Sequence, residues 1–185
     1  MNEDQILKEA KGHFDKSLQH VQEQLRGIRT GRASSALVDN VRVDYYGTPT
    51  PVSQLASVSI PEPRQIQIKP FDPSILKELA KAIAKSDLGA SPQDDGKVVR
   101  INLPPLSGDQ RQKFAGKVKE LCEEARVAMR NSRRDANKHA DQANKQGTVT
   151  DDAHRRIQTK IQELLKDYEK KVDEVHDKKV AEIME

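Results

Sequence analysis

Four arginines recur at helical spacing in residues 125–137, which read ARVAMRNSRRDAN. With about 100° of rotation per residue, Arg126, Arg130 and Arg133 fall within about 60° of one another, and Arg134 lies just beyond them. A guanidinium group is always charged, and its fork of N–H donors suits bidentate contact with phosphate oxygens. The spacing favours a phosphate-binding helix face; the alternative is a basic face that is only solvated.

Three amphipathic helices are predicted, and the second carries these arginines. Apolar residues recur every three or four positions over 7–28, 114–136 and 157–183, with Leu164 on the third stripe. Gly31 is predicted to end the first helix as its C-cap. Three narrow apolar stripes of similar length cover one another best in an elongated antiparallel three-helix bundle.

The ends of the other two helices are also marked. Ser107-Gly108-Asp109-Gln110 matches a capping box, and the second helix is expected to continue to about Gln146-Gly147. Thr148–Asp152 opens the third helix, with a threonine cap and two acids that complement the helix dipole. The second helix would therefore have about 38 residues and a length near 57 Å.

The middle of the chain has a different character, since all nine prolines lie between Pro49 and Pro105. Short strands are predicted at 41–45, 57–60, 66–69 and 99–103, with a turn at 47–51. A helix begins at Asp72-Pro73 and is closed by Gly89. This composition predicts a compact α+β module.

The predicted fold class is a two-domain α + (α+β) protein, in which a small β/α/β sandwich domain is inserted into the bundle. The predicted bundle comprises residues 1–30 and 105–185, and the inserted domain comprises 31–104. The chain passes twice between the bundle and the inserted domain, through short connections near 30–32 and 103–105, which we call the first and second crossing. Two such connections with little shared core favour hinges over a rigid connection. The predicted hinge residues are Thr30, Gly31, Arg32, Leu103, Pro104 and Pro105.

Catalysis and cofactor binding are not expected. No GxxxxGK[ST], GxGxxG or GxSxG motif occurs, and the five histidines are scattered, so neither a cofactor nor a metal is predicted. The single cysteine, Cys122, shares the apolar phase of its helix and is predicted to be a buried, inert thiol. With neither a signal peptide nor a membrane-spanning run, we expect a cytoplasmic monomer without a membrane partner.

Folded RNA is the partner that the basic residues favour. Arg111 lies beside the apolar edge of the second helix, about 35 Å along the axis from Arg134, and the first crossing adds Arg29. Only 3% of the residues are aromatic, which disfavours single-strand binding by base stacking. Recognition of RNA through its shape and phosphates fits these residues better than base-specific readout of DNA.

Six short motifs resemble those of the bacterial ribosome recycling factors, and they run in order over nearly the whole chain. They are IRTGRAS at 28–34, YYGTPTP at 45–51, QLASV at 54–58, AKSDLG at 84–89, LPPL at 103–106 and RNSRRDAN at 130–137. Each motif is weak alone, but the six together are highly specific for that family.

The resemblance implies an L-shaped protein of roughly transfer-RNA dimensions with a flexible elbow. It implies action after peptide release, with elongation factor G and its GTP hydrolysis, to split the post-termination ribosome into subunits. The bundle would lie on large-subunit ribosomal RNA near the peptidyl site and the intersubunit bridges. The RNA-contacting arginines would be Arg111, Arg130 and Arg133.

Two other classes of protein stay open from the residues alone. A coiled-coil scaffold or chaperone would need neither the arginines nor the inserted module. A hydrolase acting on translation complexes would need a positioned nucleophile or water activator, for which the sequence offers no candidate.

Overall fold

The computed structural model describes residues 1–185, and the chain divides into two compact units. The bundle unit comprises mainly Met1–Leu25 and Ala115–Ile183, and the α+β unit comprises mainly Arg26–Phe114. The predicted domain limits after residues 30 and 104, and the hinges beside them, stay predictions.

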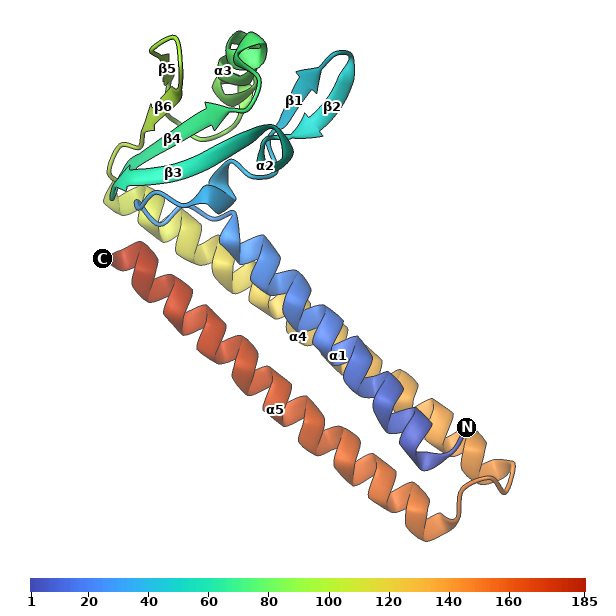
Figure 1. Cartoon of the computed structure of the whole chain (residues 1–185). Helices are drawn as coiled ribbons and strands as arrows, with labels where there is room; N and C mark the ends of the chain where they lie inside the picture. The colour runs from blue at the N-terminus through green and yellow to red at the C-terminus, as the bar shows by residue number, and fades with distance from the viewer. The chain divides into compact units, whose positions relative to one another are not determined.

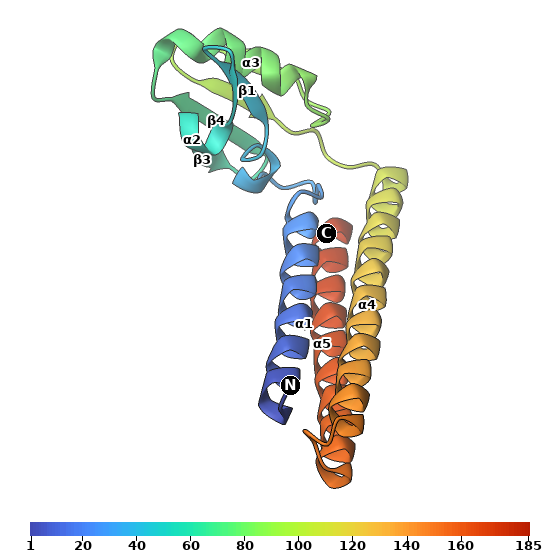
Figure 2. The same cartoon turned by 90° about the vertical axis from the view of Figure 1, so that its right-hand side faces the viewer.

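Three long helices form the bundle unit (Figure 1; Figure 2). They are α1, Glu3–Arg26; α4, Gly108–Lys145; and α5, Asp151–Met184. Glu3, at the start of α1, pairs with Lys160 near the start of α5 at 2.9 Å, whereas Glu9 lies 3.7 Å from His139 near the end of α4. Helices α1 and α5 therefore run parallel, with α4 antiparallel to both, which confirms the predicted three-helix bundle. None of the helices is long and apolar enough to cross a membrane.

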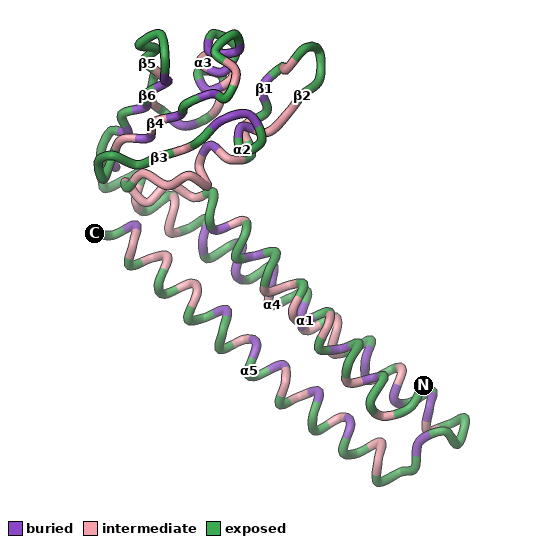
Figure 3. The backbone as a smooth tube through the Cα atoms, viewed as in Figure 1, coloured by how far each residue is buried: buried purple, intermediate pink, exposed green.

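The bundle core is formed by one buried stripe on each helix (Figure 3). One cluster joins all three helices and contains Ile6, Ala10, Ala136, Ala140, Ala143, Val149, Ile157 and Ile161. On α5 the prediction is wrong at Leu164, since Leu165 is buried and Leu164 is only half-buried. Leu164 and Leu165 lie three and four residues after Ile161, so helical spacing allows either, and packing selects one.

The α4 stripe also differs in part from the predicted one. Cys122 and Met129 are fully buried, whereas Phe114 and Ser132, which lie at the spacing of the predicted stripe, are half-buried. The predicted buried thiol is thus confirmed, and burial raises the pKa of Cys122 above its ordinary value. A raised pKa keeps the thiol protonated and unreactive.

The predicted starts of α4 and α5 are confirmed by their hydrogen bonds. The Gln110 amide donates to Ser107 Oγ at 3.3 Å, and the Ser107 amide donates to Gln110 Oε1 at 3.0 Å, which completes a capping box. Thr150 Oγ1 accepts from the Ala153 amide at 3.3 Å.

Two predicted helix ends are wrong. Helix α1 ends at Arg26, five residues before Gly31. The residue that follows Arg26 is Gly27, and glycine is a weak helix former. Helix α3 ends at Lys85 with Ser86 as its C-cap, so Gly89 lies beyond the cap. Both predictions assign the C-cap to a glycine further along the chain than the actual helix end.

The α+β unit contains a four-stranded antiparallel sheet with strand order β3-β4-β6-β5 and a separate two-stranded ribbon, β1-β2. The strands are β1, Arg42–Tyr45; β2, Thr48–Pro51; β3, Ala56–Glu62; β4, Gln65–Pro70; β5, Pro92–Asp94; and β6, Val99–Asn102. The helices are α2, Val52–Leu55, and α3, Leu76–Lys85, with 3-10 turns at Ser35–Leu37 and Pro73–Ile75.

Helix α3 packs against β1, β5 and β6, and its apolar face closes the core of this unit. Sequence patterns miss β2, β5 and α2, each of four residues or fewer. Strand β2 reads TPTP, where the sequence predicts a turn. Proline donates no backbone hydrogen bond, so such a strand is tolerated only in an edge position like this ribbon.

A tyrosine joins α1 to α5 inside the bundle unit. Tyr168 is almost fully buried, and its ring centroid lies 5.5 Å from that of Phe14. Its hydroxyl donates to the Asp15 carboxylate, and Lys171 Nζ lies 4.4 Å from the ring centroid. Burial, together with the hydrogen bond to Asp15, raises the pKa of Tyr168 to about 12.

Replacement of Tyr168 by Phe should lower the free energy of unfolding by about 1 kcal/mol near neutral pH, because it removes a buried hydrogen bond to a charged acceptor. The pKa of Tyr168 is raised from 10.0 to about 12 in the folded state, so its contribution is complete below pH 10 and is lost as the pH rises through 12. Urea unfolding at stepped pH should therefore show the difference between parent and Tyr168→Phe shrinking over that range.

The matched control is Tyr46→Phe, because the Tyr46 side chain is highly exposed. Its unfolding free energy should follow that of the parent at every pH. A difference between parent and Tyr168→Phe that stayed constant up to pH 12 would contradict the proposed linkage.

Candidate nucleic-acid interface

Three of the predicted arginines lie along α4 where it faces α5. Arg126 Nη2 lies 2.5 Å from Asp173 Oδ1, and Arg130 Nη1 lies 3.6 Å from Glu169 Oε1. One turn further, Arg133 Nη1 donates to Gln162 Oε1 at 3.1 Å. We call these six residues the polar seam: Arg126, Arg130 and Arg133 on α4 and Asp173, Glu169 and Gln162 on α5. The order of the pairs follows from the antiparallel course of the two helices.

Arg126 and Arg130 are also joined by an acid of their own helix. Glu123 accepts from Arg130 Nη2 at 2.5 Å and from Arg126 Nη1 at 3.2 Å. The hydrogen bond from Arg130, followed by that from Arg126, holds the pKa of the Glu123 carboxyl below its ordinary value against the effect of burial. Two guanidinium groups therefore share three carboxylates, and their charge is compensated within the protein.

Arg133 differs from the other two seam arginines. Its side-chain partner on α5 is a neutral amide, and it forms no salt bridge. Its Nε atom is buried without a hydrogen-bond partner. Arg133 is therefore half-buried and held by a neutral acceptor, with no carboxylate in ion-pair contact.

Two predicted arginines lie outside the seam. Arg134 is exposed and contacts only Asn131 of its own helix, at 3.5 Å. Arg111 Nη1 donates to the Met184 carbonyl oxygen at 2.6 Å, at the last turn of α5. A cation in this position stabilises the carbonyl end of a helix, so Arg111 has a structural contact of its own.

Arg29 is in the α+β unit. Its Nη1 atom lies 2.7 Å from the position that a Cβ on Gly89 would occupy, and Gly89 has a φ of +63°. The Arg29 Nε atom is buried without a hydrogen-bond partner. The left-handed φ explains why a glycine stands at this position, although it is not the C-cap of the helix.

The predicted hinge residues are also close to one another within the α+β unit. Gly31 has a φ of +81°, and a Cβ there would lie 3.8 Å from Leu106 Cγ, so the two crossing segments are in contact. Leu103 is a buried core residue whose amide donates to the Arg64 carbonyl at 2.8 Å. Of the predicted hinge segment 103–105, only Pro104 and Pro105 thus lack such anchoring to the core, and both are exposed.

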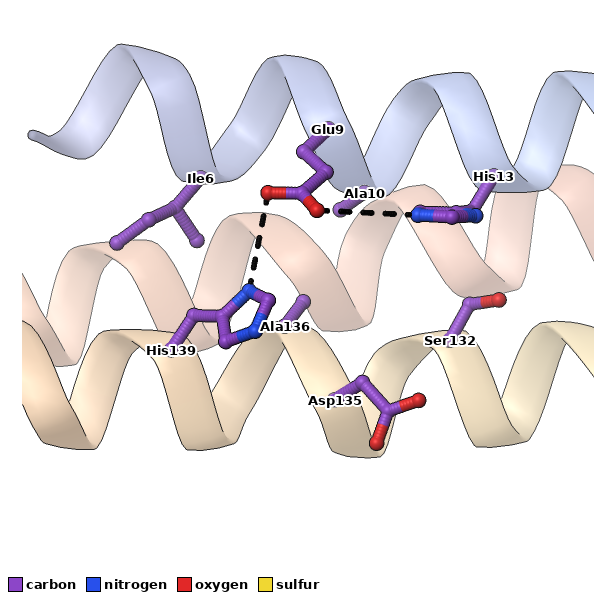
Figure 4. Close-up of a pocket in the computed structure, with 8 residues that line it drawn as sticks. All are labelled: Ile6, Glu9, Ala10, His13, Ser132, Asp135, Ala136 and His139. Atoms are coloured by element: carbon purple, nitrogen blue, oxygen red, sulfur yellow. Dashed lines mark ion pairs between the residues drawn. The ribbon is translucent and has the colours of Figure 1, made fainter. Parts of the chain in front are cut away.

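A second candidate site is a small pocket between α1 and α4 (Figure 4). Glu9 lies between two imidazoles, 3.9 Å from His13 Nε2 and 3.7 Å from His139 Nδ1, and Asp135 also lines the pocket. Two of the five histidines that look scattered in the sequence therefore meet in space. The cavity holds about 50 Å³, and no group of three His, Cys, Asp or Glu side chains is arranged to hold a metal. It has room for water but not for an organic ligand.

Sequence reasoning misses the α5 half of the seam. Gln162, Glu169 and Asp173 are spaced by seven and four residues, so they lie on one helix face beside the apolar stripe. That spacing is a detectable signal. Their pairing with particular α4 residues is not detectable, because it depends on the register between the two helices.

Known proteins similar to this chain agree on one family. The ribosome recycling factor family matches residues 21–184. The chain belongs to the ribosome recycling factor family. It is 44% identical to the ribosome-recycling factor of Geobacillus kaustophilus over 181 residues, which are 98% of each chain.

Solved structures of ribosome recycling factors have the same fold. A solution structure of a ribosome recycling factor aligns with a TM-score of 0.79 and 33% identity, over all of this chain and 98% of the other. A second match, at a TM-score of 0.70 and 36% identity over the whole of both chains, is to models for the T. thermophilus ribosome recycling factor and the E. coli elongation factor G bound to the E. coli post-termination complex.

The arginines of α4 should differ in what they contribute to stability. Replacement of Arg126 by Ala should lower the free energy of unfolding by about 1 kcal/mol, because its side chain is 21% exposed and bonds two carboxylates. The exposed Arg134 is the control, and Arg134→Ala should change the value by less than about 0.5 kcal/mol. Urea unfolding followed by circular dichroism measures both. Equal values for the two variants would show that the Arg126 pairs contribute nothing to folding.

Proposed function

We propose that this chain recycles ribosomes: with elongation factor G and GTP, it splits the post-termination ribosome into subunits after peptide release and frees the ribosome from mRNA. Membership of the ribosome recycling factor family is the observation that carries this proposal. The similar structure with elongation factor G on a post-termination complex supports the choice of partner.

We further propose that the bundle binds large-subunit ribosomal RNA, near the peptidyl site and the intersubunit bridges. Within the bundle unit, Arg133 and Arg134 form no salt bridge, so both retain charge for phosphates. Arg126 and Arg130 would add contacts at the expense of their internal carboxylate pairs. Arg111 and Arg29 each have an intramolecular contact, and we propose that they act as secondary RNA contacts.

The proposed mechanism transmits force and requires no covalent chemistry from this chain. Packing of three long helices along continuous apolar stripes makes the bundle stiff. The segments that contain Thr30, Gly31, Arg32, Pro104 and Pro105 act as the proposed hinge, through which elongation factor G moves the α+β unit. Anchored by its arginines, the bundle is then driven against the contacts that hold the subunits together.

A subunit-splitting assay tests the proposed function directly. Light scattering of post-termination ribosomes should fall when this protein, elongation factor G and GTP are all present, and should stay unchanged when any one of them is omitted. Ribosomes that stayed associated with all three present would reject the proposal.

Replacement of Arg133 by Ala should weaken binding to purified large subunits about tenfold at physiological salt. The variant loses one contact between an RNA phosphate and a guanidinium that has no carboxylate partner. The matched control is Lys138→Ala, which removes one positive charge from an exposed residue of the same helix outside the seam. It should change the affinity by less than about threefold. Circular dichroism should show unchanged helix content for both variants, and equal affinity of parent and Arg133→Ala would reject the role of Arg133.

A further inference from the structure

We infer that Gln162 is a positioning residue that makes Arg133 the main phosphate-binding group of the seam: its neutral amide holds the guanidinium in place without cancelling its charge. This inference rests on the proposed RNA-binding function of the bundle. It concerns an α5 residue that does not itself need to touch RNA.

The pairs along the seam show how Gln162 differs from its neighbours. On α5, the Asp173 carboxylate faces Arg126 and the Glu169 carboxylate faces Arg130. Glu123 of α4 adds a third carboxylate, which accepts from both arginines. At the next position the acceptor is the Gln162 amide oxygen, 3.1 Å from Arg133 Nη1. A polar acceptor of α5 faces each of the three arginines, while the compensating charge is absent at this one pair.

The immediate surroundings of Arg133 on α4 also lack an acid. The residues three and four positions away, which are its neighbours on the helix surface, are Met129, Arg130, Ala136 and Asn137. The carboxylate of Asp135 is directed to Lys138, at 3.4 Å. No nearby side chain on this helix therefore replaces the missing carboxylate.

Hydrogen bonding in this part of the bundle is incomplete. Arg133 Nε and Asn137 Oδ1, one turn apart on α4, are both buried without a partner. Buried polar groups have a hydrogen-bond partner in the great majority of cases. The only hydrogen bond that restrains the Arg133 side chain is therefore the one from Nη1 to Gln162.

A neutral acceptor has a specific advantage at a phosphate site. A guanidinium paired with a carboxylate must either break that pair or hold a phosphate next to another anion, and both cost binding energy. An amide imposes neither cost, and it still restricts the rotamers of a long side chain before the ligand arrives. The ligand class is a backbone phosphodiester. Because Gln162 is neutral, Arg133 is the seam arginine that can bind this phosphate without a carboxylate already paired to it.

The decisive variant is Gln162→Glu, which keeps size and hydrogen bonding but supplies the missing carboxylate. In the full-length protein it should weaken binding to purified large subunits about five- to tenfold at low salt. The slope of log affinity against log salt should become shallower by about one, because one cationic contact is neutralised. Its melting temperature should be equal to or above that of the parent, since a salt bridge is gained.

Two further variants separate charge from other effects. Gln158→Glu makes the same substitution one turn away on α5, where the side chain contacts His154 and not Arg133, and should change affinity less than twofold. Gln162→Ala leaves Arg133 uncompensated and should keep affinity within about threefold of the parent. Equal losses for Gln162→Ala and Gln162→Glu, or equal affinities for Gln158→Glu and Gln162→Glu, would overturn the inference.

The inference and the proposed function fail in different ways. If Arg133→Ala binds large subunits as the parent does, the proposed role of Arg133 in RNA binding is wrong, and the inference about Gln162 fails with it. If Arg133→Ala weakens binding while Gln162→Glu does not, RNA binding through Arg133 stands and only the assignment of Gln162 is overturned.

Discussion

The register between α4 and α5 is the constraint on which the bundle unit and its basic face depend. Burial of Met129 and Ala136 on α4, with Ile161 and Tyr168 on α5, sets how far one helix is displaced along the other. Once that displacement is set by apolar packing, each polar residue beside the stripes has a defined neighbour. The electrostatic character of the arginines is therefore a consequence of how the core packs.

The seam shows that a row of like residues need not act alike. Arg126 and Arg130 are engaged by Glu123, Glu169 and Asp173, so they contribute to the attachment of α4 to α5. Arg133, one turn away, is held by an amide and keeps its charge. Under the proposed RNA binding, stability and partner binding are distributed among neighbouring arginines by the acceptors that face them, which would relieve the conflict between a firmly packed helix pair and an anion-binding surface.

The three long helices are predictable in this chain, whereas the short elements β2, β5 and α2 are not. The capping box at Ser107 and the threonine cap at Thr150 are local hydrogen-bond patterns, so a few adjacent residues are enough to predict them. Strand β2 and the three-residue β5 are not predictable in this way, because their pairing is supplied by other strands and their proline content argues against a strand. The predicted glycine C-caps are wrong because both helices end before the glycine is reached, α1 at Arg26 and α3 at Lys85.

The amino-acid sequence by itself determined the three long helices, the inserted α+β module, the family, and the presence of an arginine row on one helix. These follow from periodicity, composition and short motifs, all of which act over a few residues. Only the tertiary structure decided that Arg29 lies in the α+β unit, that His13 and His139 share Glu9, and which acceptor faces each arginine. Such neighbours depend on the relative displacement of whole elements, which is set by packing and is not encoded at any single position.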